Sequence, residues 1–239
     1  MDELLDLDRT LLLSWNGSDS LFLDGFMWMY SNMWMWFPMA FCLLLLIVRN
    51  NDTSRYLTIF LLIGLLVTAS DQLSSGLLKP LVERFRPTHE PAIASLIDTV
   101  REYRGGTYGF PSSHAANSFA LFVFSALLIR HWGYTLAMFL WASITGYSRI
   151  YLGVHYPGDV LCGAILGALL GFLFYSIYLY LTNRGTDRYN HKNTYHSKYS
   201  QQTNTCSGYS ISQIHLYIVV FLLSNIAAMG IGLFVISNP

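Results

Sequence analysis

The sequence is poor in charged residues. Asp, Glu, Lys and Arg account for 12% of its 239 residues, whereas hydrophobic residues account for 53%. A soluble domain usually carries about 25% charged residues, so this shortage favours a membrane protein. The formal net charge is zero and no basic stripe is present, so no nucleic-acid partner is expected.

Two further features are scarce. The first residues, Met-Asp-Glu-Leu-Leu-Asp, lack the basic start of a secretory signal peptide, and we therefore expect the first apolar run to stay in the mature protein. The sequence has only three cysteines, which are odd in number and widely separated. That pattern predicts neither a disulfide framework nor a metal cluster.

In place of charge, the sequence has six long apolar runs separated by polar connections. They cover residues 26–48, 56–78, 115–129, 132–148, 160–182 and 216–236. About 20 apolar residues in a helix cross a hydrocarbon core of about 30 Å, and the third run approaches that length with Ser113 and His114 included. We predict an all-α, polytopic membrane protein with six transmembrane helices in a single domain, residues 1–239.

The segment before the first run is amphipathic. Leu4, Leu7, Leu11 and Trp15 lie on one helical stripe, and charged residues occupy the other side. The segment is too polar to cross a bilayer, so we predict an interfacial helix within residues 1–22 that lies along the membrane. The alternative is a soluble helix packed on a loop.

Glycines mark the fifth apolar run. Gly163, Gly167 and Gly171 are spaced by four residues, a pattern that lets two helices approach closely. The connection that follows, residues 183–215, is polar and has few aliphatic residues before Ile211. We expect it to be a loosely ordered loop.

Counting six spans places the polar connections on two sides of the membrane. Residues 79–114 and 149–159 then face the side that holds both termini. Each side carries seven Lys and Arg residues. Lys79, Arg86 and Arg149, however, fit a role in chemistry. Without these three, four cations remain on the side of the termini and seven on the opposite side. By the positive-inside rule, the polar loop after the fifth run is cytoplasmic, and the shared face is turned to a periplasm or an outer surface.

Three cations on that shared face suit an anion with several oxygens. The guanidinium groups of Arg86 and Arg149 can each donate two parallel hydrogen bonds to a phosphate, and Lys79 adds a third positive charge. Ser112 and the backbone N–H groups at the start of the third apolar helix can supply further donors. Since Lys79 and Arg86 are seven residues apart, a helical segment would place them on one face.

Two histidines and one aspartate share the same face. Beside a bound phosphate, one imidazole can attack phosphorus while the other protonates the leaving oxygen. Asp159 follows His155 by four residues, a spacing that allows it to orient this ring through the second nitrogen. Taken singly, a histidine or a cation at a membrane boundary is as often an interfacial or snorkelling residue, but the joint pattern with His114 favours a site.

These residues resemble the three-part signature of the type 2 phosphatidic acid phosphatase (PAP2) superfamily. The parts are Lys79-x6-Arg86-Pro87, Pro111-Ser112-Ser113-His114 and Ser148-Arg149-x5-His155-x3-Asp159. Their order and spacing match the family, and the likeness extends roughly over residues 20–180.

The resemblance implies a bundle of six membrane helices and a set of roles. His155 would be the nucleophile that forms a phosphohistidine, Asp159 would orient it, and His114 would be the general acid. The phosphoryl oxygens would be held by Lys79, Arg86, Ser112, Ser113 and Arg149. The family needs no metal or other cofactor, which agrees with the lack of a carboxylate cluster or a His-Glu-x-x-His motif in this sequence.

One position departs from the family. The third residue of the second part is usually Gly, which permits close backbone approach to a phosphate, and here it is Ser113. We expect Ser113 still to donate its N–H, while its hydroxyl narrows the pocket or adds a contact. His89 is either a headgroup contact or an exposed loop residue. Asp71 either supports Lys79 or Arg149 or lines a wet helix contact.

The function that these features predict is hydrolysis of a lipid phosphate or diphosphate at the cell inner membrane, with the active site facing the periplasm or outer side. Undecaprenyl diphosphate, phosphatidylglycerol phosphate, phosphatidic acid and lipid A are the candidate substrates, and a loop over residues 101–109 suits a bulky or multiply charged headgroup. The alternatives are a lipid phosphotransferase that uses the same His155 and, from another class, a non-catalytic membrane scaffold or transporter. The sequence leaves the oligomeric state open.

Overall fold

The computed structural model describes residues 2–186 and 204–237. These residues are mostly helical and contain no β-strand, which confirms the all-α class. The helices in order are α1 (Asp2–Trp15), α2 (Leu21–Tyr30), η1 (Met33–Trp36), α3 (Phe37–Asn50), α4 (Thr53–Asp71), η2 (Gln72–Leu78), α5 (Lys79–Val82), η3 (Pro87–His89), η4 (Ala94–Leu96), η5 (Val100–Glu102), α6 (Ser113–Ile129), α7 (Trp132–Tyr151), α8 (Pro157–Thr186) and α9 (Ile211–Ser237).

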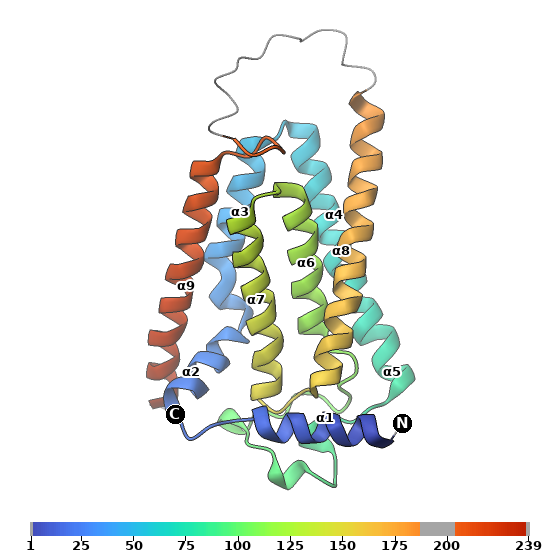
Figure 1. Cartoon of the computed structure of the whole chain (residues 1–239), viewed down its shortest axis with the longest axis vertical. Helices are drawn as coiled ribbons and strands as arrows, with labels where there is room; N and C mark the ends of the chain where they lie inside the picture. Colours follow the sequence, from blue (N-terminus) through green and yellow to red (C-terminus); the bar gives the residue numbers. More distant parts are fainter. Residues whose placement is uncertain (1, 187–203, 238–239) are drawn as a thin grey trace.

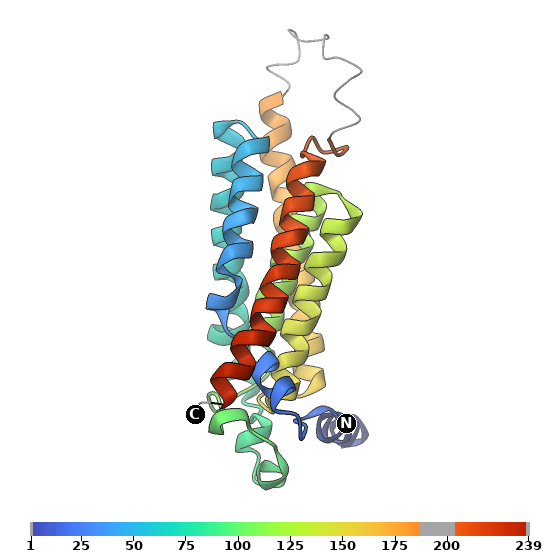
Figure 2. The ribbon, with the colours of Figure 1, turned by 90° about the vertical axis from the view of Figure 1, so that its left-hand side faces the viewer.

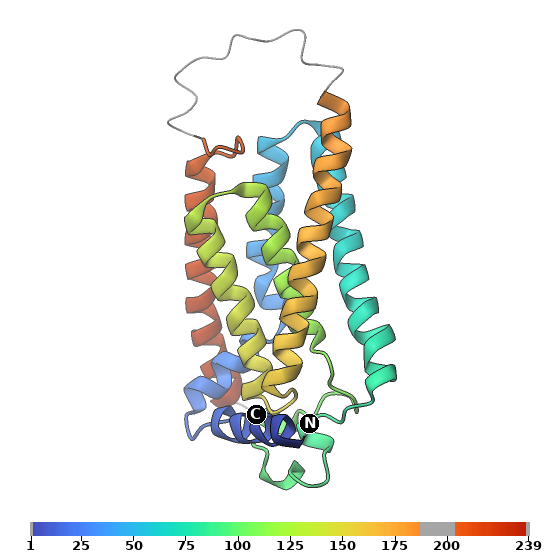
Figure 3. The ribbon, with the colours of Figure 1, turned by 45° about the vertical axis from the view of Figure 1, so that its right-hand side comes forward.

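The long helices form one bundle. In Figure 1, α3, α4, α6, α7, α8 and α9 run alongside one another, while α1 lies across one end of the bundle. The connection between α5 and α6 folds at this same end, and both ends of the described chain also lie there (Figures 2 and 3). We call this the α1 end.

Four helical segments are long and apolar enough to cross a membrane. They are Met33–Asn50, Thr53–Val82, Pro157–Thr182 and Ile211–Ser237. Helix α6 is also apolar but shorter, and α7 is not in this group. By the length and composition of these segments the chain is a multi-pass membrane protein, while membrane crossing by α6 and α7 stays a prediction.

The first predicted apolar helix, residues 26–48, is wrong as a single element. The chain instead forms α2, a turn at Ser31 and Asn32, the short helix η1, and then α3. The Asn32 side chain accepts a hydrogen bond from Trp34 N (3.1 Å), and such local bonds compete with continuation of a helix. Pro38 falls in the first turn of α3, where it is tolerated, because a proline deeper in a helix clashes with the turn before it.

The second apolar run changes geometry just before Lys79. Helix η2 is a wider π-helix, which accommodates Pro80, because proline lacks an N–H and crowds the preceding turn. Helix α5 ends after one turn, where Glu83 takes a left-handed conformation (φ 50°). Lys79 and Arg86 therefore do not share a helix face, and that prediction is wrong, since Arg86 has an extended backbone in the α5–α6 connection.

Helices α6 and α8 lie in close contact, as the glycine spacing predicts. Three glycines of α8 each face a backbone carbonyl of α6, and a side chain at any of them would overlap that carbonyl. The pairs are Gly163 with Ser112, Gly167 with Ala116, and Gly171 with Ala120. At the α1 end, Ser112 N–H donates to the Asp159 carbonyl (2.9 Å), so the start of α6 is fixed against the start of α8.

The polar loop predicted over residues 183–215 is shorter than expected. Helix α8 continues to Thr186, and α9 begins at Ile211. Residues 187–203 of that prediction lie outside the described residues. Residues 204–210 form a tight turn that is closed by backbone hydrogen bonds and leads into α9.

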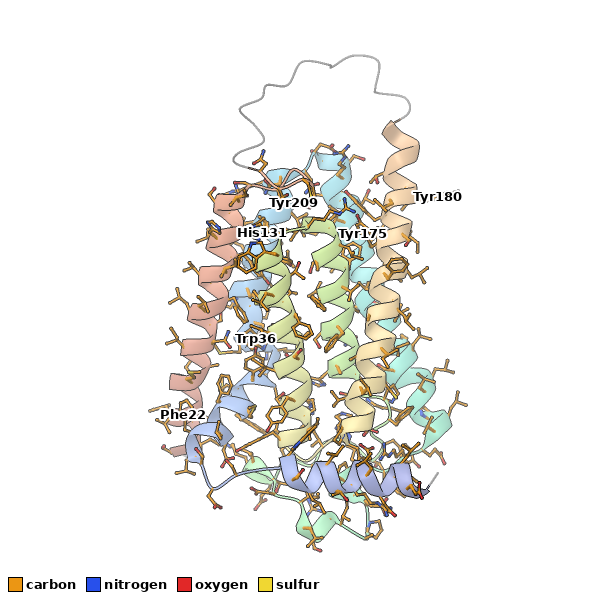
Figure 4. The ribbon with its side chains drawn as sticks, in the orientation of Figure 1. Phe22, Trp36, His131, Tyr175, Tyr180 and Tyr209 are labelled. Carbon is orange, nitrogen blue, oxygen red and sulfur yellow. The ribbon has the colours of Figure 1, made fainter. Side chains whose placement is uncertain are left out.

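Several tyrosines lie toward the end of the bundle that is away from α1. Figure 4 places Tyr175, Tyr180 and Tyr209 toward that end and Phe22 toward the α1 end. Tyrosine rings are enriched at membrane–water interfaces. Aromatic side chains thus lie toward both ends of the bundle.

Helix α1 packs on the rest of the chain through a small core of its own. Leu12 is fully buried. Its neighbours in this core are Ile93, Ile97, Ile150 and Tyr156. Just after the helix, Asn16 Nδ2 donates to the carbonyls of Asp98 (2.9 Å) and Tyr151 (2.8 Å). Helix α1 is thereby held against both the α5–α6 connection and the turn between α7 and α8.

Candidate active site

The polar residues that the sequence singles out meet at the α1 end. They come from α5, the α5–α6 connection, the start of α6, the end of α7 and the turn into α8. In chain order they are Lys79, Arg86, Ser112, Ser113, His114, Arg149, His155 and Asp159. The two connections that span counting assigns to one face do lie together.

Lys79 is held at the start of α6. Its Nζ donates to Ser113 Oγ (2.6 Å) and to Ser75 Oγ (3.3 Å). Ser75 Oγ in turn donates to Asp71 Oδ1 (3.4 Å). The hydroxyl that replaces the usual glycine hydrogen is thus a direct contact to the ammonium, and Asp71 is linked to Lys79 through Ser75.

Arg86 is buried beneath the α5–α6 connection. Its Nε donates to the Tyr108 carbonyl (3.1 Å) and its Nη1 to the Val154 carbonyl (3.4 Å). Gly105 has a positive φ of 68° and lies against the guanidinium, where a Cβ would come within 2.7 Å of Nη1. The backbone of the connection therefore wraps around Arg86 and fixes its orientation.

Arg149, at the end of α7, is 2% exposed. Its Nη1 donates to Ser31 Oγ and its Nη2 donates to the Tyr103 hydroxyl (3.2 Å). Its Nε has no hydrogen-bond partner among the described residues. A buried donor that lacks a partner is costly, and an anion bound beside it would remove that cost.

His155 and Asp159 face each other at the turn into α8. His155 Nδ1 lies 3.5 Å from Asp159 Oδ2, and both side chains are almost fully buried. The same Oδ2 accepts a hydrogen bond from Tyr156 N (3.0 Å). A distance of 3.5 Å is slightly longer than an ordinary hydrogen bond, as is common for catalytic pairs before substrate binds.

The protonation state of His155 follows from its surroundings. Burial lowers the pKa of His155 well below its ordinary value of 6.5, and the positive charges of Arg86, Arg149 and Lys79 lower it further. The imidazole is therefore neutral at pH 7. Neutral imidazole is the form that can act as a nucleophile.

The first residues of α6 present a histidine and a helix N-terminus. Ser112 caps the helix, since its Oγ accepts from Ala115 N (3.5 Å), and its O–H remains available as a donor. His114 is exposed and lines a cavity of about 170 Å³ together with Arg149. A phosphate in this cavity would meet both the guanidinium and the imidazole.

Three side chains of this cavity come from α2 and the turn after it, and the sequence did not predict them. Trp28, Ser31 and Asn32 line it, together with Tyr103 from the connection. The Trp28 and Tyr103 rings meet edge to face, with centroids 5.6 Å apart. The adjacent Ser31 and Asn32 inside an otherwise apolar run are the one sequence signal that marks this turn.

Arg84 is a further residue that sequence reasoning missed, since it enters only the count of Lys and Arg residues on the shared face. Its Nη1 donates to Asp159 Oδ1 (2.8 Å), and its Nη2 donates to Asp8 Oδ2 (2.7 Å). The second contact joins the connection to α1, which is 76 residues away in sequence. No spacing rule brings Asp8 to Arg84, so only the fold could identify this network.

The remaining polar candidates are more peripheral. His89 Nδ1 lies 3.1 Å from Thr88 Oγ1, and the ring is only partly exposed. The part of the chain that the structure describes contains no group of three His, Cys, Asp or Glu side chains arranged for a metal ion. The residues singled out from the sequence that meet at this end are three cations, two imidazoles and one carboxylate, and Arg84 and Asp8 join them.

Comparison with known proteins agrees with this arrangement. Residues 59–183, more than half of the chain, match the sequence model of the PAP2 superfamily. Among solved structures, the chain resembles the transmembrane PAP2 type phosphatidylglycerolphosphate phosphatase of Bacillus subtilis, with a TM-score of 0.56 and 21% identity, covering 81% of this chain and 90% of that chain. This likeness supports the fold.

Two curated relatives are more similar in sequence. The lipid A 4'-phosphatase of Bacteroides thetaiotaomicron is 43% identical over 182 residues, which cover 76% of this chain and 81% of the relative. The lipid A 4'-phosphatase of Porphyromonas gingivalis is 37% identical over 184 residues, or 77% of this chain and 78% of the relative. On the family match, these relatives and the fold, the chain belongs to the PAP2 superfamily.

Proposed function

We propose that this chain is a membrane lipid phosphatase that hydrolyses a phosphate monoester on the sugar headgroup of a lipid of the lipid A type. The observation that carries the proposal is that Lys79, Arg86 and Arg149 lie close enough to His155 to act on its charge, while Arg149 also lines one cavity with His114. Three cations can hold a phosphoryl group and stabilise the charge that develops during its transfer. The two relatives named lipid A 4'-phosphatase support the substrate class.

In the first step, His155 attacks phosphorus with the nitrogen that faces away from Asp159. Asp159 accepts the Nδ1–H hydrogen bond and stabilises the positive charge that the ring gains. The bond between phosphorus and the lipid oxygen breaks, and His114, which the negative charge of the bound phosphate favours in its protonated form, gives its proton to that oxygen. The products are the dephosphorylated lipid and a phosphohistidine.

In the second step, water replaces the lipid. Neutral His114 takes a proton from the water, whose oxygen attacks phosphorus. The bond between phosphorus and the His155 nitrogen breaks, and inorganic phosphate leaves. Both histidines return to their starting protonation states, so the cycle consumes one water and needs no metal or other cofactor.

The cavity beside the cations supports a sugar headgroup. Its walls combine the aromatic rings of Trp28 and Tyr103 with the polar side chains of Ser31 and Asn32. Binding sites for small molecules are typically apolar surfaces with a few placed polar groups, and a pyranose ring with its hydroxyl groups suits this mixture. The connection over residues 101–109 supplies Tyr103 to this cavity, which supports a role for this loop in contacting the headgroup.

We also propose the membrane arrangement that the sequence predicts, with six spans in one domain. Helices α6 and α7 have 17 and 20 residues, which at about 1.5 Å per residue are about 26 and 30 Å long. Leu4 and Leu7 of α1 are 72% and 54% exposed, which suits a helix that lies in the interface. The α1 end then faces the periplasm or outer side of the inner membrane, and the loop after α8 is cytoplasmic.

The test uses the full chain purified in detergent and four lipids. Inorganic phosphate release is measured with lipid A, phosphatidylglycerol phosphate, phosphatidic acid and undecaprenyl diphosphate, each with and without a chelator. We expect lipid A to be the best substrate and the chelator to have no effect. The variant His155→Ala should lose activity by roughly 10⁴-fold or more.

The matched control is His215→Ala on α9. His215 lies near His131 (6.2 Å between ring centroids), and Figure 4 shows His131 toward the end of the bundle away from α1. This variant should keep wild-type activity. A fully active His155→Ala variant would contradict the mechanism, and transfer of the phosphoryl group to a lipid or sugar acceptor without release of phosphate would favour the phosphotransferase.

A further inference from the structure

One arginine joins two carboxylates at the α1 end. The Arg84 guanidinium donates to Asp159 Oδ1 (2.8 Å) with one nitrogen and to Asp8 Oδ2 (2.7 Å) with the other. The side chains are 20% exposed for Arg84, 13% for Asp8 and 0% for Asp159. These are short, charge-assisted bonds in a largely buried place, where they fix geometry more strongly than a surface pair does.

The Asp8 carboxylate also holds the start of α8. Its Oδ1 accepts the N–H of Gly158 (2.7 Å), the residue directly before Asp159. A Cβ at Gly158 would come within 2.7 Å of Asp8 Oδ2, so the glycine leaves the space that Asp8 occupies. A carboxylate at a helix N-terminus is also favoured by the helix dipole.

These contacts leave Asp159 with one orientation. Its Oδ1 is taken by Arg84 and its Oδ2 by Tyr156 N, and the same Oδ2 faces His155 Nδ1 at 3.5 Å. The Arg84 guanidinium is itself positioned over the Tyr156 ring, 3.9 Å from its centroid. Loss of the bond to Asp8 would free Arg84, and Asp159 could then turn away from His155.

We propose that Asp8 of the crosswise helix α1 is a positioning residue for catalysis. It holds Arg84, Arg84 holds Asp159, and Asp159 orients His155. The proposal rests on the phosphatase function proposed above. It gives α1 a role beyond contact with the membrane surface, because the seating of this helix determines the alignment of the nucleophile.

The test compares Asp8→Asn with Asp6→Asn in the full chain. Asp6 is on the same helix, but its side chain is 74% exposed and, within residues 2–186 and 204–237, its only ion pair is with Arg9 at 3.6 Å. Asp6→Asn therefore removes the same charge without touching the network. Phosphate release from lipid A in detergent micelles is measured over a range of lipid concentrations. Asp8→Asn should lower kcat roughly 10- to 100-fold with KM within about twofold, and Asp6→Asn should change neither.

Two further measurements separate positioning from folding. Asp8→Glu keeps the charge and should recover part of kcat, while the thermal midpoint of each variant shows whether it is folded. The single variant Arg84→Ala and the double variant Asp8→Asn/Arg84→Ala should show the same fold-loss of kcat relative to the wild type. Once Arg84 is gone, Asp8 has no further effect, because residues in one chain of contacts act non-additively. If Asp8 had only a structural role, the fold-losses of kcat in the two single variants would multiply in the double variant. Each loss would also match the decrease in the folded fraction of that variant.

The outcomes are distinguishable. If neither the wild type nor any variant releases phosphate, the proposed function itself is overturned. If the wild type is active, His155→Ala is inactive and Asp8→Asn keeps the wild-type kcat, the function stands and the positioning role is overturned. Losses that multiply in the double variant also overturn it.

Discussion

Ser113 stands where the family usually has glycine, and its hydroxyl has a defined partner. Lys79 Nζ donates to it at 2.6 Å, and Ser75 Oγ lies 2.7 Å from it. A glycine here would leave the ammonium with Ser75 as its remaining contact. Ser113 thus lacks the backbone freedom of glycine, but its side chain fixes Lys79, one of the three cations proposed to bind phosphate.

Ser113→Ala should therefore weaken substrate binding. A hydrogen bond to a charged group contributes about 1.5–3 kcal/mol, so kcat/KM should fall by roughly tenfold or more. Ser118→Ala is the control, because Ser118 is in the same helix and donates only to the Ala115 carbonyl (3.2 Å). Equal kinetics of the two variants would show that the hydroxyl has no role in holding Lys79.

The buried His155 should make stability depend on pH. Because burial lowers its pKa in the folded protein, the unfolded chain binds the proton more readily. The contribution of neutral His155 to the free energy of unfolding is then fully present above the unfolded-state pKa of about 6.5. As the pH drops below that value, the free energy of unfolding decreases by up to about 1.4 kcal/mol per pH unit. The thermal midpoint should drop between pH 6.5 and 5, and the slope should be shallower for His155→Gln. Parallel slopes would contradict a neutral, buried imidazole.

At this scale, the residues that sequence reasoning could identify are those within short motifs. His155 and Asp159 are four residues apart, and Ser112 and His114 share one helix start, so local spacing suffices. Arg84 escaped notice because its partner Asp8 is far away in sequence, and such a pairing depends on how α1 docks. Whether each residue has its predicted role in catalysis stays a prediction.

At the scale of elements, the contact between α6 and α8 carries the most weight for the site. The small residues of the two helices let their backbones touch, and the same contact joins Ser112 to Asp159. A shift of one helix against the other would separate the proposed acid from the proposed nucleophile. The catalytic geometry therefore depends on small residues that lie well inside the bundle.

Gly167→Val should disturb both stability and activity. Its side chain would overlap the Ala116 carbonyl, and such overpacking typically costs about 1–3 kcal/mol. The control is Gly230→Val on α9, where no atom lies within 4 Å of the added Cβ and the helix-propensity change is the same. We expect a lower thermal midpoint and slower phosphate release for Gly167→Val alone.

Elements were predictable where periodicity is simple. Helices α6 to α9 follow apolar runs and glycine spacing, so their existence and order could be predicted. The break at Ser31 and the π-helix before Lys79 could not be predicted. A few polar groups or one proline determine the backbone geometry there, and the apolar composition of the run gives no sign of it. The error in the helix face of Lys79 and Arg86 has this origin.

At the scale of the whole molecule, counting spans predicted which connections meet. An even number of crossings returns the chain to its starting side, and both ends of the described chain do lie at the α1 end. Orientation could not be derived with the same security, because the raw count of cations is equal on the two sides and the difference depends on the proposed chemistry. The crosswise position of α1 agrees with its amphipathic pattern.

The close approach of α2 to α9 has a consequence for how such enzymes diverge. Gly25 of α2 and Gly232 of α9 lie so near that a side chain on either would overlap the other's backbone. Helix α9 therefore packs directly against α2, the helix that carries Trp28. Both helices lie outside residues 59–183, the part that matches the family. In the proposed enzyme, part of the headgroup cavity is thus encoded outside the stretch that carries His114 and His155, and selection can change that part while these two residues are kept.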